Sequence, residues 1–274
     1  MAGRKNDILQ EYRVHKVQPT VYYWPEFITE QEHDYLLQQV YAAPKPKWTQ
    51  LSNRRLQNWG GLPHEKGMIA EPLPQWLGSY AGKLANLGIF QEHTPNHVLV
   101  NEYQPGQGIM PHEDGPLFYP TVATISLGSH TILDFYHHRQ DVEDNSTAPQ
   151  LGNQSKDRLF TSLLLEPRSL VIIQDDMYKK HLHGINETTV DDITDNIANL
   201  EQCKAEVGNR LERTTRVSLT IRYFAKVLKA KLMIGNMKRS VAAIKAHLEE
   251  LHPGSCFRSV SWRNRAGRGK VKNL

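Results

Sequence analysis

The spacing of hydrophobic and polar positions changes part-way along this 274-residue chain. Residues 29–43 carry apolar side chains at helical intervals, at Tyr35, Leu36, Val40 and Tyr41. Thr29 stands at the start of this segment with Glu32 three residues later, which is the sequence of a capping box, so we predict that a helix begins there. A second helix is predicted over about 74–88, where two glycines weaken an otherwise helical pattern.

Beyond about residue 95 the pattern is that of short strands. Runs rich in β-branched residues are separated by glycine, proline or asparagine, at 96–103, 121–128, 130–136, 161–167, 169–175 and 216–224. An earlier run, 19–28, predicts a strand or an extended arm. Helices followed by many short strands indicate an α+β domain or a double-sheet jelly roll that carries N-terminal helices.

Three stretches interrupt these elements. Residues 44–74 are rich in proline and glycine, and we expect them to form loops that project from the body of the domain. Polar insertions occupy 137–158 and 185–212, and each is long enough to be a surface excursion or a flexible loop.

Composition places the chain among ordinary globular proteins, with 39% apolar and 23% charged residues. No run of apolar residues is long enough to span a membrane, and the first residues lack the apolar stretch of a secretory signal, so we expect no membrane association. The only cysteines, Cys203 and Cys256, show no CxxC spacing. This disfavours a disulfide framework or a thiolate zinc site and favours a reducing compartment.

The charge is distributed unevenly. Residues 226–274 hold 12 Lys/Arg against 2 Asp/Glu, whereas residues 1–225 hold 21 against 27. We therefore predict a basic C-terminal extension, with an amphipathic helix over 237–251 and a disordered tail after it. Such an extension suits a polyanion such as nucleic acid, or nuclear localisation, but a solvated extension without a partner fits the same composition.

Candidate chemistry begins at His112 and Asp114. Residues two apart in an extended segment face the same side, which brings one imidazole and one carboxylate together while Glu113 faces away. Such a pair is weak evidence alone, because a catalytic metal needs a third ligand. His181 and His183 lie on a later segment, and either would complete the two-histidine, one-carboxylate triad of non-haem Fe(II) oxygenases.

A row of polar residues lies on the strand 216–224. Even spacing puts four of them on one face: Arg216, Ser218, Thr220 and Arg222. Buried guanidinium groups are costly unless they meet an anion, and a dicarboxylate cosubstrate would supply one. Asn101 and Tyr103 repeat the same two-residue spacing on another strand.

These motifs, an N-x-Y strand, HEDG, a distal HG and R-x5-R, occur in the same order as in the AlkB-type Fe(II)/2-oxoglutarate dioxygenases, which the chain resembles over roughly residues 15–225. The resemblance implies a mainly β fold with α-helices, a double-stranded β-helix or jelly roll with N-terminal helices and a lid at about 44–72. It makes residues 1–225 the dioxygenase domain and leaves 226–274 outside it.

The resemblance also implies roles for individual residues. The Fe(II) ligands would be His112, Asp114 and His183, the last chosen over His181 because it directly precedes glycine. The 2-oxoglutarate contacts would be Asn101, Tyr103, Arg216, Thr220 and Arg222. A straight strand would separate the two arginines by about 20 Å. Either the strand curves or Arg222 faces the metal and substrate instead.

The function implied is oxidative demethylation of alkylated DNA or RNA with Fe(II), 2-oxoglutarate and dioxygen, in nucleic-acid repair or modification. The alternatives are hydroxylation or demethylation of a protein on the same iron centre, and a nucleic-acid-binding module with weak turnover. The lid and the basic extension would contact the nucleic acid, although the acidic body disfavours tight binding of duplex DNA. We expect a monomer in the cytoplasm and nucleus.

Some side chains remain open to two interpretations. In the lid, aromatic and basic residues could stack on bases and pair with phosphates, or could belong to the core and the solvated surface. These residues are Lys45, Lys47, Trp48, Arg54, Arg55 and Trp59. Phe118 and Tyr119 could likewise stack on a base or pack internally. His64, His93 and His97 have no partner at ligand spacing, so we assign them no role.

Overall fold

A computed structural model describes residues 8–17, 20–138 and 155–228 of the chain. The basic extension beyond residue 228 and most of the 137–158 insertion lie outside these described residues. The division of the chain at residue 225, and the helix and disordered tail of the extension, therefore stay predictions.

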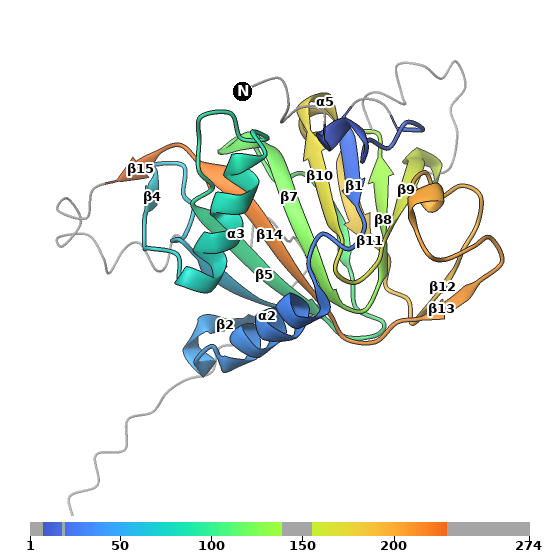
Figure 1. Ribbon diagram of the computed structural model, residues 1–274, viewed down its shortest axis with the longest axis horizontal. Coiled ribbons are helices and arrows are strands. Elements are labelled where there is room, and N and C mark those ends of the chain that lie inside the picture. The colour runs from blue at the N-terminus through green and yellow to red at the C-terminus, as the bar shows by residue number, and fades with distance from the viewer. Residues whose placement is uncertain (1–7, 18–19, 139–154, 229–274) are drawn as a thin grey trace, which may run out of the picture. The chain divides into compact units, whose positions relative to one another are not determined.

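Two antiparallel sheets form the core of the fold (Figure 1). The larger sheet has the order β1 (Val21–Trp24), β10 (Leu170–Gln174), β7 (Phe118–Gly128), β14 (Arg216–Phe224), β5 (His97–Tyr103), β3 (Arg55–Trp59) and β2 (Trp48–Gln50). The smaller sheet has the order β6 (Ile109–His112), β11 (Leu182–Ile185), β8 (Thr131–Tyr136) and β9 (Leu159–Leu165). One buried cluster draws residues from both sheets, so the sheets face each other. The predicted jelly-roll class is confirmed.

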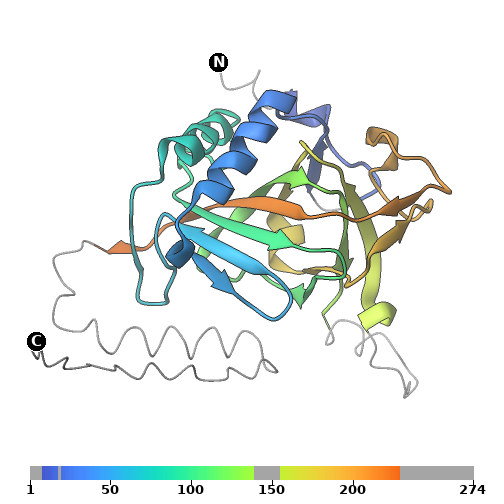
Figure 2. The ribbon, with the colours of Figure 1, turned by 90° about the horizontal axis from the view of Figure 1, so that it is seen from below.

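Two helices cover the outer face of the larger sheet: α2 (Glu30–Ala42) and α3 (Gln75–Asn86). Leu36 of α2 and Leu77 of α3 pack with Val217, Leu219 and Ile221 of β14 in one buried cluster. Because side chains alternate across a strand, the intervening polar residues of β14 face the smaller sheet. Figure 2 shows the same layers from below, with β14 and β5 side by side.

The predicted start of the first helix is confirmed in detail. The Thr29 hydroxyl accepts a hydrogen bond from the backbone N–H of Glu32 at 3.2 Å, and the Glu32 carboxylate accepts one from the N–H of Thr29 at 2.8 Å. Glu32 also accepts a hydrogen bond from the hydroxyl of Tyr80 on α3. The capping box therefore fixes the start of α2 and ties the two helices together.

Replacing Thr29 with alanine should lower the free energy of unfolding by about 1 kcal/mol, because it leaves a backbone N–H of the first turn without its acceptor. Urea denaturation would show this as a lower midpoint with an unchanged m-value. Thr29→Ser keeps the hydroxyl and should match the wild type. Equal midpoints for the alanine and serine variants would show that the cap contributes nothing.

Residues 44–74 differ from the prediction. They do not project as loops: after the short helix η1 (Lys45–Lys47), β2 and β3 extend the larger sheet, and β3 pairs with β5 from Arg55 to Trp59. A short strand β4 (Met68–Ile69) pairs with β15 (Val227–Leu228). The sequence pattern missed these strands because they are stabilised by their partners and not by local alternation: β3 pairs with β5, β2 with β3, and β4 with β15.

The 185–212 insertion is also more ordered than expected. It contains the paired strands β12 (Val190–Asp192) and β13 (Arg210–Glu212) and the short helix η3 (Leu200–Gln202). Ile193 and Ile197 are buried against Leu164 in a small cluster of their own. The short helices η2 (Ser155–Arg158) and α5 (Asp175–Lys179) complete the described elements. None of the helices in the described part of the chain has the length and apolar character to cross a membrane.

Candidate active site

Two side chains from the smaller sheet and one from the segment after β6 meet at one point between the two sheets. His112 ends β6, Asp114 follows it, and His183 lies opposite His112 on β11. One potential ligand atom from each of these residues lies within 4.8 Å of the others. The structure thus brings His183 to the His-x-Asp pair. His181 instead packs its ring against Phe160 at 4.7 Å.

The protonation of these groups suits metal binding. Burial, followed by the neighbouring His183, lowers the pKa of His112 to about 3, and burial also lowers the pKa of His183. Both imidazoles therefore carry a free lone pair at neutral pH. Nδ1 of His112 lies 2.9 Å from the carbonyl oxygen of Met110, which leaves Nε2 to face the cluster.

Asp114 is held by an arginine from the larger sheet. The guanidinium of Arg222 donates to Oδ1 of Asp114 at 2.5 Å and lies 4.1 Å from the ring centre of Phe118. Burial alone would raise the pKa of Asp114, but Arg222 and the two imidazoles lower it below its ordinary value. Oδ2 is buried without a hydrogen-bond partner among the described residues. A carboxylate oxygen and two imidazole nitrogens with free lone pairs fit a divalent iron.

A buried cation lies on the larger sheet. Arg216 is 4% exposed, donates to the hydroxyl of Ser126 at 3.0 Å and lies over the ring of Tyr103. Its Nε has no partner within the described part of the chain. Burial lowers the pKa of Arg216 to about 10, which still leaves it charged at neutral pH. A buried guanidinium without a carboxylate fits one end of a dicarboxylate such as 2-oxoglutarate.

Comparison with known proteins identifies the family. The sequence matches the 2OG-Fe(II) oxygenase superfamily over residues 6–222. The chain belongs to this superfamily. Fe(II), 2-oxoglutarate and dioxygen are accordingly the cofactor and cosubstrates of this dioxygenase.

Individual relatives place the oxygenase in its AlkB-type branch. It is 56% identical over 227 residues to a Danio rerio protein named "Probable RNA/DNA demethylase ALKBH6", a match that covers 83% of this chain and 95% of the relative. It is 28% identical over 221 residues to "Uncharacterized protein L905" of Acanthamoeba polyphaga mimivirus, covering 77% of this chain and 87% of that protein. A solved structure, "The structure of OsALKBH1", matches with a TM-score of 0.49 and 14% identity, covering 76% and 98% of the two chains.

The other sequence-predicted cosubstrate residues of the oxygenase share the inner face of the larger sheet. In the ladder between β14 and β5, Arg216 lies opposite Tyr103 and Ser218 lies opposite Asn101. Thr220 lies on the same face. Arg222 departs from this group because its described contact is with Asp114, which is the second alternative left open by the sequence.

Arg54 is a site residue that the sequence reasoning misplaced. Both interpretations left open for it, a phosphate partner or a solvated surface charge, place it on the exterior, but it is 9% exposed and its Nε donates to Oδ1 of Asn101 at 3.2 Å. Burial raises the pKa of Tyr103, and the positive charges of Arg54 and Arg216 oppose that rise. Arg54 therefore brings a further positive charge to the inner face of the oxygenase.

The remaining lid residues support the packing interpretation. Arg55 forms two 2.7 Å hydrogen bonds with Glu102 and lies 4.2 Å from the ring centre of Trp48. Lys47 lies over Trp59, which makes an edge contact with Trp76 of α3, and both lid tryptophans pack against the main core. Phe118 and Tyr119 are also in contact with other rings: Phe224 and His97 for Phe118, and Phe90 and His93 for Tyr119.

His97 is a second residue that the sequence reasoning missed. It is fully buried, lies opposite Arg222 in the ladder, and has no hydrogen-bond partner on either ring nitrogen within the described residues. An available signal was its even spacing from Asn101 and Tyr103, which places all three on the inner face of β5. His97 has no metal-ligating residue at ligand spacing, so this alternation is its one signal in the sequence.

Proposed function

We propose that this oxygenase removes methyl groups from alkylated nucleic acid by oxidation. The observation that carries the proposal is the cluster of His112, Asp114 and His183, together with the buried Arg216, which has no carboxylate partner among the described residues. The choice of nucleic acid is supported by the 56% identity to a protein named as a probable RNA/DNA demethylase. The proposal includes action in the cytoplasm and nucleus as a monomer, and the basic residues 226–274 suit both a nuclear address and a nucleic-acid contact.

In this proposal each residue of the active site has a defined role. His112 and His183 hold iron through neutral imidazoles, while the Met110 carbonyl orients His112 and Arg222 orients Asp114. Asn101, Tyr103, Thr220 and Arg216 bind 2-oxoglutarate, with Arg216 on the far carboxylate. The bound metal and cosubstrate supply the activation of dioxygen for attack on a C–H bond. Hydroxylation of an N-methyl group then releases formaldehyde and the unmodified base.

The test is mass spectrometry of methylated DNA and RNA oligonucleotides and methylated peptides after incubation with the purified full-length protein, Fe(II) and 2-oxoglutarate. We expect one or more oligonucleotides to lose the mass of a methylene group, with succinate and formaldehyde released in equal amounts. The loss should be absent with Asp114→Ala, which removes a ligand atom from the cluster.

Three other outcomes would contradict the proposal. Mass changes confined to peptides would favour a protein-directed oxygenase. Succinate release without any change in an oligonucleotide would leave oxygenase activity but remove this substrate class. Tight oligonucleotide binding without succinate would favour the binding-module alternative. Deletion of 226–274 tests the extension separately, and unchanged affinity would exclude it from nucleic-acid binding.

A further inference from the structure

Positive charge dominates the inner face of the active site. Three arginines with buried side chains face it: Arg54, Arg216 and Arg222, which are 9%, 4% and 6% exposed. Only Arg222 has an acidic partner, Asp114. Arg54 and Arg216 donate to the neutral oxygens of Asn101 and Ser126. Within the described residues, no second carboxylate lies at ion-pair distance from any of these three guanidinium groups.

The nearest acidic residues in the sequence are directed elsewhere. Glu102 alternates to the outer face of β5, where it pairs with Arg55. Glu113 is exposed and pairs with His138 at 3.2 Å. The excess of positive charge on the inner face is therefore a property of how β3, β5 and β14 orient their side chains.

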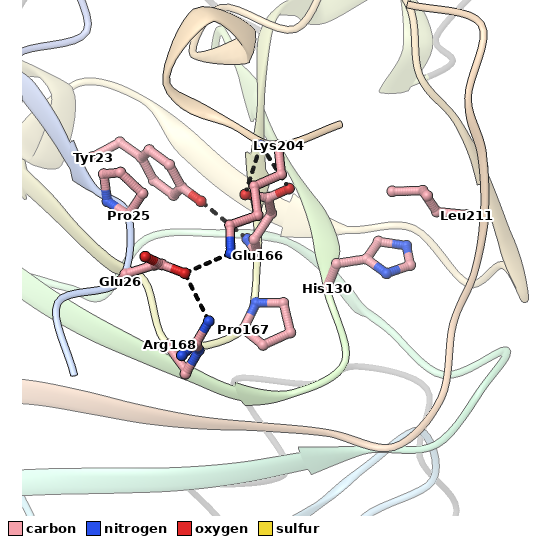
Figure 3. A pocket seen from close by; sticks show the side chains of 9 residues that line it. All are labelled: Tyr23, Pro25, Glu26, His130, Glu166, Pro167, Arg168, Lys204 and Leu211. Atoms are coloured by element: carbon pink, nitrogen blue, oxygen red, sulfur yellow. Dashed lines mark hydrogen bonds and ion pairs between the residues drawn. The ribbon is translucent and has the colours of Figure 1, made fainter. Parts of the chain in front are cut away.

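Two other groups of basic residues in the described part of the chain are compensated by carboxylates. In a cavity of about 330 Å³, Arg168 and Lys204 both pair with Glu26, at 2.7 and 2.5 Å. Figure 3 shows the side chains that line this cavity. The buried Arg213 forms two hydrogen bonds with Asp191, at 2.7 and 2.8 Å. The active site differs because two of its three buried arginines, Arg54 and Arg216, have no carboxylate partner among the described residues.

The excess of positive charge persists when Fe(II) and 2-oxoglutarate are bound. A dianionic cosubstrate and Asp114 carry three negative charges, against five positive charges on iron(II) and the three guanidinium groups. A cationic group that enters this site is repelled at low effective dielectric, whereas a neutral or anionic group is not.

From this charge distribution we infer that the methylated base which this oxygenase prefers is neutral or anionic, and that Arg54 is a specificity-determining residue which disfavours cationic bases. The inference rests on the proposed function, since it concerns the substrate of the same site. Methylation of a ring nitrogen in adenine or cytosine leaves the base positively charged at neutral pH. Methylation of the equivalent nitrogen in guanine or uracil leaves the base neutral.

Two matched pairs of oligonucleotides test the inference: 3-methyluracil against 3-methylcytosine, and 1-methylguanine against 1-methyladenine, each in one sequence context. We expect the neutral member of each pair to have the higher kcat/KM, by about tenfold or more. Arg54→Gln should lower the ratio of kcat/KM for the neutral base to kcat/KM for the cationic base. Arg54→Lys should leave this ratio unchanged because the positive charge remains. Arg55→Gln is the matched control, since Arg55 pairs with Glu102 on the outer face and should leave the ratio unchanged.

The ratio of two kcat/KM values from one preparation does not depend on the folded fraction, so the ratio can be measured even for a destabilised variant. Fluorescence anisotropy without oxygen gives a second measurement, and affinities should follow the same order. Equal use of both members, preference for the cationic member, or an unchanged ratio in Arg54→Gln would overturn the inference while demethylation itself continued. If no member were demethylated or bound while 2-oxoglutarate was consumed, the proposed function would fall and the inference with it.

Discussion

His183→Ala should lower succinate formation by on the order of a thousandfold, whereas His181→Ala should remain within about threefold of the wild type. The two histidines are separated by one residue, and the structure gives them different surroundings. His183 contributes to the ligand cluster, and His181 packs against Phe160 and His137. Removal of His183 leaves two ligand side chains, too few to hold a catalytic iron, and adds no buried charge.

The measurement is succinate formation with saturating Fe(II) and 2-oxoglutarate, accompanied by titration of iron under anaerobic conditions. We expect His183→Ala to lose stoichiometric iron binding and His181→Ala to retain it. Thermal unfolding of the two variants provides the check on folding. If the two variants lost activity equally while both remained folded, the assignment of His183 over His181 would be wrong.

The glycine that follows His183 explains why the sequence favours His183 over His181 as the metal ligand. A Cβ atom on Gly184 would lie 3.0 Å from the carbonyl oxygen of Ile109 and 3.0 Å from the nitrogen of Pro111. A side chain there would push β11 away from β6, the strand that carries His112. The HG signature thus records a steric requirement for close strand approach, and the sequence displays it directly.

The row on β14 shows what alternation can predict. Val217, Leu219 and Ile221 pack under the helices, so Arg216 and its even-numbered neighbours had to face inward. Alternation could not show which acceptor each arginine meets. That depends on pairing with β5 and on Asp114, which approaches from the other sheet.

Arg54 shows where the sequence was insufficient. Arg54 and Arg55 are adjacent, of the same type, and lie in a stretch whose composition is that of a loop. A shift of one residue in strand pairing would exchange which of them faces the site. Only the pairing of β3 with β5 decides that Arg55 meets Glu102 and that Arg54 meets Asn101.

Arg216→Met should raise the KM for 2-oxoglutarate by about a hundredfold and, without the cosubstrate, should raise the free energy of unfolding by roughly 1–2 kcal/mol. The two effects have one cause. Burial lowers the pKa of Arg216 to about 10, and a cation whose pKa falls on folding destabilises the folded state at every pH below that value. The cost is present in full at neutral pH, because neutral pH lies below the lowered pKa and the group stays charged in the folded state, where its described acceptor is the uncharged hydroxyl of Ser126. Methionine is of similar length and removes the buried charge.

Arg213→Met is the matched control, because Arg213 is also buried but has a carboxylate partner. Its removal leaves Asp191 in the interior with only His130 nearby, so we expect a loss of roughly 3 kcal/mol in stability and an unchanged KM for 2-oxoglutarate. The two substitutions should therefore change stability in opposite directions. 2-Oxoglutarate should raise the melting temperature of the wild type and of Arg213→Met, but much less that of Arg216→Met. If Arg216→Met destabilised the protein and left the KM for 2-oxoglutarate unchanged, Arg216 would be a structural residue. A stabilised protein with a raised KM would show that this buried charge serves cosubstrate binding at a cost in stability.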